Sequence, residues 1–278
     1  MNPKTWFVTG SSSGFGRAIV EAALAAGHRV IATARDIRSI ADLECAGSCH
    51  VMTLDVTETD EIPHVLREAA KVWGSIDVLV NNAGYGLIGA VEECSDDQIR
   101  RNFETNFFGP MNIVRAALPV LRAQKSGCIV NISAAAAIAN YAGFGIYGAA
   151  KAALELMSES LRIELAPLGI RVMLVQPGPF RTDFISRSLD RAEQRLEDYD
   201  RTSGKFARFL ETMDGKQPGD PARAAKAIIA AVESDTPPLR LVLGKYANEK
   251  ARKRYADAEK ERAAWEQVGL PTDFNSTP

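Results

Sequence analysis

The chain has 278 residues, of which 46% are hydrophobic, and its formal net charge at pH 7 is −2. Such a composition suits a globular protein with a sizeable core, and the small net charge argues against nucleic acid or an anionic membrane as a partner. The sequence shows no secretory signal and no apolar run of ~18 residues, so we expect a cytoplasmic protein without a membrane span.

Four cysteines occur in the chain, and without a secretory signal we expect all of them to be free thiols. Cys45, Cys49 and His50 lie close enough in sequence to suggest a metal site. A fourth ligand is missing, however, and His50 begins a predicted strand. We therefore expect no bound metal.

Short β-branched runs alternate with helical stretches along the first half of the chain, as in successive βαβ units. Strands are predicted over 5–9, 29–33, 51–54, 78–81, 128–132 and 171–175, and helices over 14–26, 59–72, 95–123 and 147–168. Pro110 predicts a break in the third helix near Gly109. Because the strands are apolar throughout, we expect a doubly wound parallel sheet with helices on both faces.

The character of the sequence changes after Pro177. Residues 179–218 are polar, charged and weakly periodic, and they are too few to form a core of their own. We expect this segment to cover the active site as a substrate lid, within a single domain of residues 1–278. A helix over 221–233, a strand over 239–243, a charged surface helix over 245–267 and a frayed tail over 269–278 complete the prediction.

A glycine-rich turn lies between the first predicted strand and the first helix. A Cβ at its glycines would hold the backbone away from a pyrophosphate, and the helix start directs free N–H groups at the anion. The turn therefore predicts a phosphate cradle, with a serine-rich turn containing incidental glycines as the alternative. Its binding residues are Gly10, Ser12, Ser13, Gly14, Phe15 and Gly16.

The end of the second predicted strand bears on which dinucleotide is bound. An acidic residue at this place would hold a ribose 2′-hydroxyl, but the strand ends at Ala34 and Arg35 follows. A guanidinium suits a 2′-phosphate better. We therefore expect a preference for NADP(H). NAD(H) is the alternative if Arg35 faces solvent and Asp36 turns inward.

Two further motifs complete a pattern: residues 81–84 (Asn-Asn-Ala-Gly) follow a strand, and Tyr147 precedes Lys151 by four residues at the start of a helix. Together with the cradle, they make residues 5–185 resemble the short-chain dehydrogenase/reductase family. The order of residues 82–86 and the charged last helix resemble its retinol- and hydroxysteroid-dehydrogenase-like branch. This resemblance implies a Rossmann-type three-layer α/β fold and hydride transfer between NADP(H) and a lipophilic or aromatic alcohol or ketone.

The resemblance also implies roles for individual residues. Lys151 would hold the nicotinamide ribose hydroxyls, and Asn106 would position a water that links Lys151 to solvent. Independently of the family, an ammonium four residues after a helical tyrosine lies beside the phenol and favours its ionised form, which suits Tyr147 for proton transfer. The remaining implied cofactor contacts are Asp55 and Val56 at the adenine, Asn82, Ala83 and Gly84 along the cleft, and Pro177, Gly178 and Thr182 near the carboxamide.

One position departs from the family pattern. The family reads Asn-Ile-Ser-Ser after its fifth strand, and the second serine binds the substrate oxygen; here that place holds Ala134. Ser133 does not replace it, because neighbouring side chains in extended backbone point to opposite faces. With every other motif complete, this pattern favours an engineered variant of low activity over a divergent natural protein.

We expect the substrate to be a small molecule that contacts Tyr141, Phe144, Phe180 and Phe184. The alternative is that these rings are ordinary packing residues. The resemblance implies a homodimer or homotetramer assembled through the long helices. A non-catalytic dinucleotide-binding redox sensor is the main rival function, and Ala134 is the observation in its favour. An epimerase or dehydratase would need a longer chain after Pro177.

Overall fold

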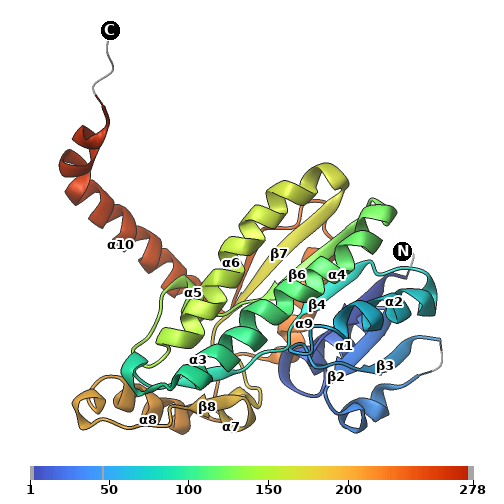
Figure 1. Ribbon diagram of the computed structural model, residues 1–278, viewed down its shortest axis with the longest axis horizontal. Coiled ribbons are helices and arrows are strands. Elements are labelled where there is room, and N and C mark those ends of the chain that lie inside the picture. Colours follow the sequence, from blue (N-terminus) through green and yellow to red (C-terminus); the bar gives the residue numbers. More distant parts are fainter. Residues whose placement is uncertain (1–2, 46, 275–278) are drawn as a thin grey trace.

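The computed structural model describes residues 3–45 and 47–274, and its centre is a seven-stranded parallel sheet of order β3-β2-β1-β4-β6-β7-β9 (Figure 1). The chain moves outward through β2 and β3, returns to β4 beside β1, and continues in the opposite direction. The connections that leave the carboxyl ends of β1 and β4 therefore run to opposite faces of the sheet, and ligands bind at such a point in sheets of this kind. The strands are β1 (Thr5–Val8), β2 (Arg29–Ala34), β3 (Cys49–Thr53), β4 (Val78–Asn81), β6 (Gly127–Ile132), β7 (Ile170–Pro177) and β9 (Arg240–Leu243).

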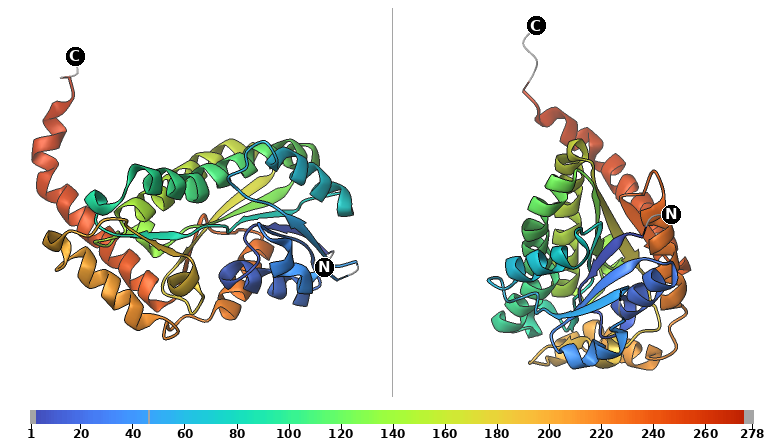
Figure 2. Two further views of the ribbon diagram at one scale, coloured as in Figure 1. Left: turned by 60° about the horizontal axis from the view of Figure 1, so that its bottom comes forward. Right: turned by 90° about the vertical axis from the view of Figure 1, so that its right-hand side faces the viewer.

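Helices cover both faces of this sheet, which confirms the predicted doubly wound α/β fold (Figure 2). Trp6 and Val8 pack into an apolar cluster on one face, whereas Phe7 between them packs into the cluster on the other. Both faces must be apolar because each is covered. The first face carries α1 (Gly14–Ala25) and α9 (Pro221–Glu233), and the second carries α2 (Ile62–Trp73), α4 (Gly109–Gln124) and α6 (Gly145–Leu165).

Near Pro110, where the sequence predicts a break or bend, the helical run is not interrupted but contains one π-helical turn. Helix α3 (Asp96–Phe103) continues into η3 (Glu104–Phe108) and then into α4, in whose first turn Pro110 lies. Proline fits at a helix start because its missing N–H would have no partner there. The wider turn carries Asn106, one of the predicted site residues, and such turns often occur at functional sites.

The segment 179–218 is more regular than expected. It contains α7 (Phe184–Arg187), β8 (Leu189–Arg191), η5 (Glu197–Tyr199) and α8 (Ser203–Met213), and β8 pairs in parallel with β5 (Gly86–Ile88). Strands of three residues have too little periodicity to stand out in a sequence. The other short elements are η1 (Ile37–Leu43), η2 (Val91–Glu93), α5 (Ala135–Ile138) and η4 (Ala166–Leu168).

The last helix, α10 (Lys245–Gly269), projects away from the body of the protein (Figure 1). Its buried residues are Ala247 and Ala251, so its first turns dock beside α5. The helix runs two residues beyond the predicted end and is followed by η6 (Leu270–Thr272); residues 275–278 of the expected frayed tail lie outside the described residues. None of the helices described is both long enough and apolar enough to cross a membrane.

Candidate active site

The glycine-rich turn after β1 leaves no room for side chains at two of its glycines. Gly10 has a φ of +68°, and a Cβ there would lie 2.9 Å from Ala83 Cα. A Cβ at Gly16 would collide with the Gly10 carbonyl oxygen and lie 2.5 Å from Asn82 Nδ2. Ser13 makes no side-chain cap to α1, so the first N–H groups of that helix stay free to bind an anion. These residues fit the pyrophosphate of a dinucleotide.

The Asn82–Ala83 motif is bound directly to this turn. Asn82 Nδ2 donates to the carbonyl oxygens of Thr9 (2.9 Å) and Gly10 (3.0 Å), and the backbone N–H groups of Asn82 and Ala83 donate to Thr9 Oγ1. Part of the motif therefore joins the loops after β1 and β4, while Gly84 beyond it is exposed. Thr182, in the loop after β7, reaches the same turn, since a Cβ at Gly14 would lie 3.4 Å from Thr182 Cβ.

At the end of β2, Arg35 is exposed and Asp36 is already engaged. Asp36 accepts hydrogen bonds from Arg38 N (3.0 Å), Nε (2.9 Å) and Nη2 (3.0 Å), and these bonds lower the pKa of the Asp36 carboxyl. Asp36 also caps η1 through this contact. After β3, Asp55 Oδ1 accepts from Thr57 N (3.0 Å) and Thr57 Oγ1 (2.8 Å), so its side chain shapes the turn that contains Val56.

Tyr147 and Lys151 lie on the buried face of α6, with exposed fractions of 7% and 4%. Lys151 Nζ donates to the Ile132 carbonyl oxygen at the end of β6 (2.9 Å). Burial lowers the pKa of Lys151 to about 8, although the nearby Glu155 charge opposes this change. Burial also raises the pKa of Tyr147. The expected lowering of the phenol pKa by Lys151 is thus not seen, because desolvation dominates in this structure.

Asn106 has one free atom directed at the same place. Its Nδ2 donates to the carbonyl oxygens of Tyr85 (2.9 Å) and Asn102 (3.0 Å), whereas its buried Oδ1 has no hydrogen-bond partner among the described residues. A Cβ at Gly84 would lie 2.6 Å from this Oδ1 and 3.2 Å from Lys151 Nζ. Both polar atoms therefore border the space above Gly84, which suits a bridging water.

Ser133 and Ala134 point to opposite sides, as the alternation argument predicts. Ala134 has extended backbone (φ −159°, ψ 159°) and belongs to the buried cluster that contains Tyr147. Ser133 Oγ instead donates to Glu155 Oε1 at 2.5 Å, inside the protein. Since its hydroxyl is committed there, Ser133 offers no hydrogen bond toward the Tyr147 side.

Aromatic rings extend from Tyr147 toward α8. The ring centroid of Tyr147 lies 5.2 Å from that of Phe144, Phe144 lies 5.2 Å from Phe206, and Phe206 stacks on Tyr141 at 4.9 Å. Phe184 reaches Tyr147 from the other side at 5.8 Å. We name Tyr141, Phe144, Phe184 and Phe206 the aromatic cluster.

Phe180 is not part of this cluster. Its ring packs on Phe15 of the phosphate turn, with centroids 5.1 Å apart, and it belongs to the apolar cluster around α1 and α9. The structure therefore places Phe180 against Phe15 and the core around α1 and α9, and not among the rings near Tyr147, where Phe206 packs on Phe144. A substrate contact at Phe180 stays a prediction.

Sequence reasoning also missed two contributions from the first turns of α10. Tyr246 Oη lies 3.1 Å from Tyr141 Oη, and Lys250 Nζ lies 3.0 Å from the centre of the Tyr141 ring. Burial lowers the pKa of Lys250 to about 8. These residues occupy i and i+4 positions of one helix, and that spacing is the only signal the sequence contains for them.

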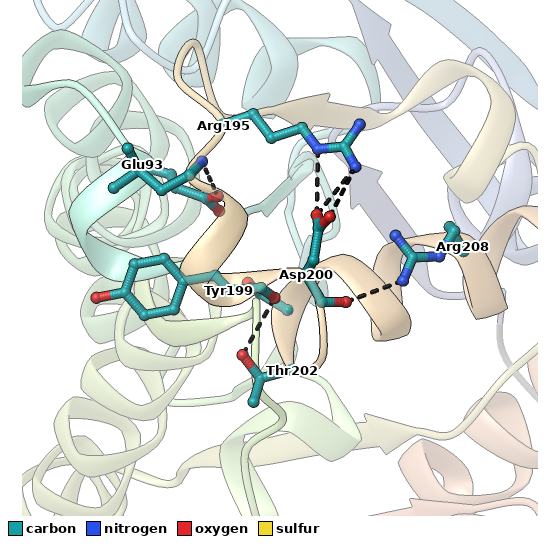
Figure 3. Close-up of polar contacts among 8 residues, drawn as sticks. Glu93, Arg195, Tyr199, Asp200, Thr202 and Arg208 are labelled. Atoms are coloured by element: carbon teal, nitrogen blue, oxygen red, sulfur yellow. Dashed lines mark hydrogen bonds and ion pairs between the residues drawn. The ribbon is translucent and has the colours of Figure 1, made fainter.

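The segment between β8 and α8 is held by its own polar contacts (Figure 3). Asp200 accepts from Arg195 Nε (3.2 Å) and Nη2 (2.9 Å), and its carbonyl oxygen accepts from Arg208 Nη2 (2.9 Å). Glu93, from the body of the protein, accepts from Leu196 N (2.9 Å). The segment is thereby fastened beside the aromatic cluster, to which α8 contributes Phe206.

Comparisons with known proteins agree with this arrangement. The family model described as short chain dehydrogenase matches residues 4–193. Human retinol dehydrogenase 8 is 33% identical over 258 residues, covering 86% of this chain and 80% of that protein. A solved short-chain dehydrogenase from Streptomyces avermitilis is 42% identical, covers 98% of this chain and 99% of its own, and superimposes with a TM-score of 0.91.

A short-chain dehydrogenase from Burkholderia cenocepacia, solved in complex with NADP, is 27% identical. The match covers 95% of this chain and 97% of that one, with a TM-score of 0.74. The family model, the identities and the shared fold lead to one conclusion. The chain belongs to the short-chain dehydrogenase/reductase family.

Proposed function

We propose that this protein is an NADP(H)-dependent oxidoreductase that interconverts a lipophilic or aromatic alcohol and the corresponding ketone, at a rate limited by Ala134. The observation that carries the proposal is the buried Tyr147–Lys151 pair, which lies beside a cradle that fits a dinucleotide. An engineered replacement of serine by Ala134 is the interpretation that the otherwise complete motifs favour.

A nicotinamide dinucleotide held by the turn at Gly10, Gly14 and Gly16 would supply a hydride to the carbonyl carbon in reduction and would accept one from the carbinol carbon in oxidation. The phenol of Tyr147 donates the proton to the carbonyl oxygen in reduction and takes it back in oxidation. Lys151 Nζ and Asn106 Oδ1, which border the space above Gly84, return protons from solvent through a water. Ala134 provides no hydroxyl, so the substrate oxygen is polarised by Tyr147 without a second donor.

The preference for NADP(H) is proposed from Arg35, because Asp36 is occupied by Arg38. Charge-assisted hydrogen bonds to a phosphate are each worth about 1.5–3 kcal/mol. In Arg35→Ala we therefore expect the Kd for NADPH, measured by isothermal titration, to rise ~10–100-fold while that for NADH barely changes. Arg29→Ala, which removes the same charge at the opposite end of β2, is the control. Equal weakening of both cofactors in Arg35→Ala would contradict the proposal.

The aromatic cluster supports a lipophilic or aromatic substrate, and retinol dehydrogenase 8 is named for such an alcohol. Burying or stacking an aromatic ring is worth roughly 1.5–3 kcal/mol. We expect Phe206→Ala, made in the Ala134→Ser background, to lower kcat/KM for an aromatic ketone ~10-fold or more. A short aliphatic ketone should lose much less. Phe209, which is 54% exposed, gives the matched control Phe209→Ala; similar losses in both variants would argue against a substrate at the cluster.

We further propose that residues 179–218 form the substrate lid of a single domain spanning residues 1–278, with 245–267 as its C-terminal helix. Phe206, which this segment contributes to the aromatic cluster, supports this role. A homodimer or homotetramer through α4 and α6 is proposed as well. Leu156 and Ile163 on α6 support it, since they are 66% and 77% exposed.

A further inference from the structure

One buried carboxylate in the protein has no role in the mechanism above. Glu155 is 7% exposed and lies on α6 one turn beyond Lys151, so Tyr147, Lys151 and Glu155 follow one another at four-residue steps along one helix face. A buried carboxylate is costly unless it is paired and hydrogen-bonded. Glu155 therefore needs partners that offset the cost of burying its carboxylate.

The contacts of Glu155 join three neighbouring strands: the carboxyl ends of β6 and β7 and the first residue of β9. Oε1 accepts from Ser133 Oγ at the end of β6 (2.5 Å), and Gln176 Nε2 on β7 donates to both carboxylate oxygens (2.8 and 2.9 Å). Arg240 Nε on β9 lies 3.6 Å from Oε2 and also pairs with Glu159. Both oxygens thus act as acceptors, which is the role of an ionised carboxylate.

The same strand end also holds Lys151. Its Nζ donates to the carbonyl oxygen of Ile132, the last residue of β6. The residue that follows is Ser133, whose hydroxyl donates to Glu155. Lys151 is almost completely buried, and the Glu155 charge is the one that acts against its desolvation. The polar and charged groups that face this pair from other elements are Asn106 from η3, the Ile132 carbonyl and Ser133 at the end of β6, Gln176 from β7 and Arg240 from β9.

We propose that Glu155 is a positioning residue for the catalytic pair. Its carboxylate, oriented by Ser133 and Gln176, keeps the buried Lys151 ammonium protonated and fixes the end of β6 against which Nζ rests. The Ser133 hydroxyl points away from Tyr147 and donates to Glu155, so it is part of this support. The effect on turnover rests on the proposed function of Tyr147, whereas the effect on Lys151 does not.

The test is the titration of Lys151 in ¹³C-lysine-labelled protein without cofactor, with its Cε resonance assigned from Lys151→Arg. In Glu155→Gln we expect the pKa of Lys151 to fall by about one unit, because an opposite charge has been removed. Ser133→Ala keeps that charge and should shift the pKa much less. Ser158→Ala breaks the buried 2.8 Å hydrogen bond from Asn131 Nδ2, so it controls for lost packing in α6. It should lower the melting temperature and leave the titration unchanged.

Turnover provides the second readout. In Glu155→Gln we expect kcat for ketone reduction to fall ~10-fold at similar KM, with the high-pH limb of the profile displaced to lower pH. In this variant Lys151 loses its proton at a lower pH, and the Tyr147 phenol then lacks a neighbouring cation. A shifted titration without any turnover would remove the proposed function and leave the role of Glu155 intact.

An unchanged Lys151 titration in folded Glu155→Gln would overturn the proposal. If that variant does not fold, Arg240→Met gives the opposite test at a side chain that is 30% exposed. Removing this cation should raise the pKa of Lys151, and a titration identical to that of the unmodified protein would overturn the proposal equally.

Discussion

Replacing Ala134 with serine should raise kcat for ketone reduction by ~10²–10³, equivalent to about 3–4 kcal/mol of transition-state stabilisation. The reason is geometric: Ala134 lies in the same buried cluster as Tyr147, so a hydroxyl there would reach the oxygen that receives the proton. Cofactor absorbance, followed with NADPH and with NADH against aromatic and aliphatic ketones, gives the rates. The Kd for NADPH should not change, because the cradle after β1 is untouched.

Ala135→Ser is the matched control. Ala135 is buried like Ala134, but it lies outside the buried cluster that contains Tyr147. The rate of Ala135→Ser should equal that of the unmodified protein. If Ala134→Ser binds cofactor and reduces no substrate of a broad panel, the oxidoreductase proposal fails for this chain. The redox-sensor alternative then gains, and partners captured differently in NADP⁺ and NADPH would support it.

Replacing Tyr147 with phenylalanine in the Ala134→Ser background should lower kcat by ~10²–10⁴, the usual contribution of a positioned acid or base. The ring stays, so packing on Phe144 and Phe184 is preserved and the protein should melt at nearly the same temperature. Initial rates over a range of substrate concentrations should show the loss in kcat with little change in cofactor Kd.

Tyr141→Phe removes a hydroxyl from the aromatic cluster near Tyr147. It tests whether the loss of kcat is specific to the Tyr147 hydroxyl. The Tyr141 hydroxyl bonds Tyr246 Oη, so its loss should change kcat by no more than a few-fold. Were Tyr147→Phe to keep most of the activity, the proton would have to come from another group, and Tyr147 would be only a packing residue.

The parts of the site that could be predicted are those written in local spacing. The cradle is a run of glycines between a strand and a helix, and Tyr147 and Lys151 are one helical turn apart. The orientation of Ser133 followed from the two-residue period of a strand, and its bond to Glu155 agrees. Even an irregularity in the helix before Pro110 could be expected from the missing N–H, although not its form as a π-helical turn.

Contacts between distant segments could not be predicted in this way. Phe180 and Phe206 lie in one segment whose sequence is weakly periodic, yet Phe180 packs on Phe15 and Phe206 stacks on Tyr141. The path of residues 179–218 decides between them, and that path includes the pairing of β8 with β5. Three-residue strands are stabilised by the partner they meet, so neither is visible alone.

The sequence by itself determined the fold class, the glycine-rich turn between β1 and α1, the four-residue spacing of Tyr147 and Lys151, and the alanine at position 134, because each depends on backbone periodicity or on neighbours within one turn. Only the tertiary structure decided which rings surround Tyr147, that α10 reaches Tyr141, and that Glu155 connects Lys151's helix with Ser133, Gln176 and Arg240. These contacts join residues far apart in the chain, and they form because close packing must satisfy each buried polar group where the folded layers meet.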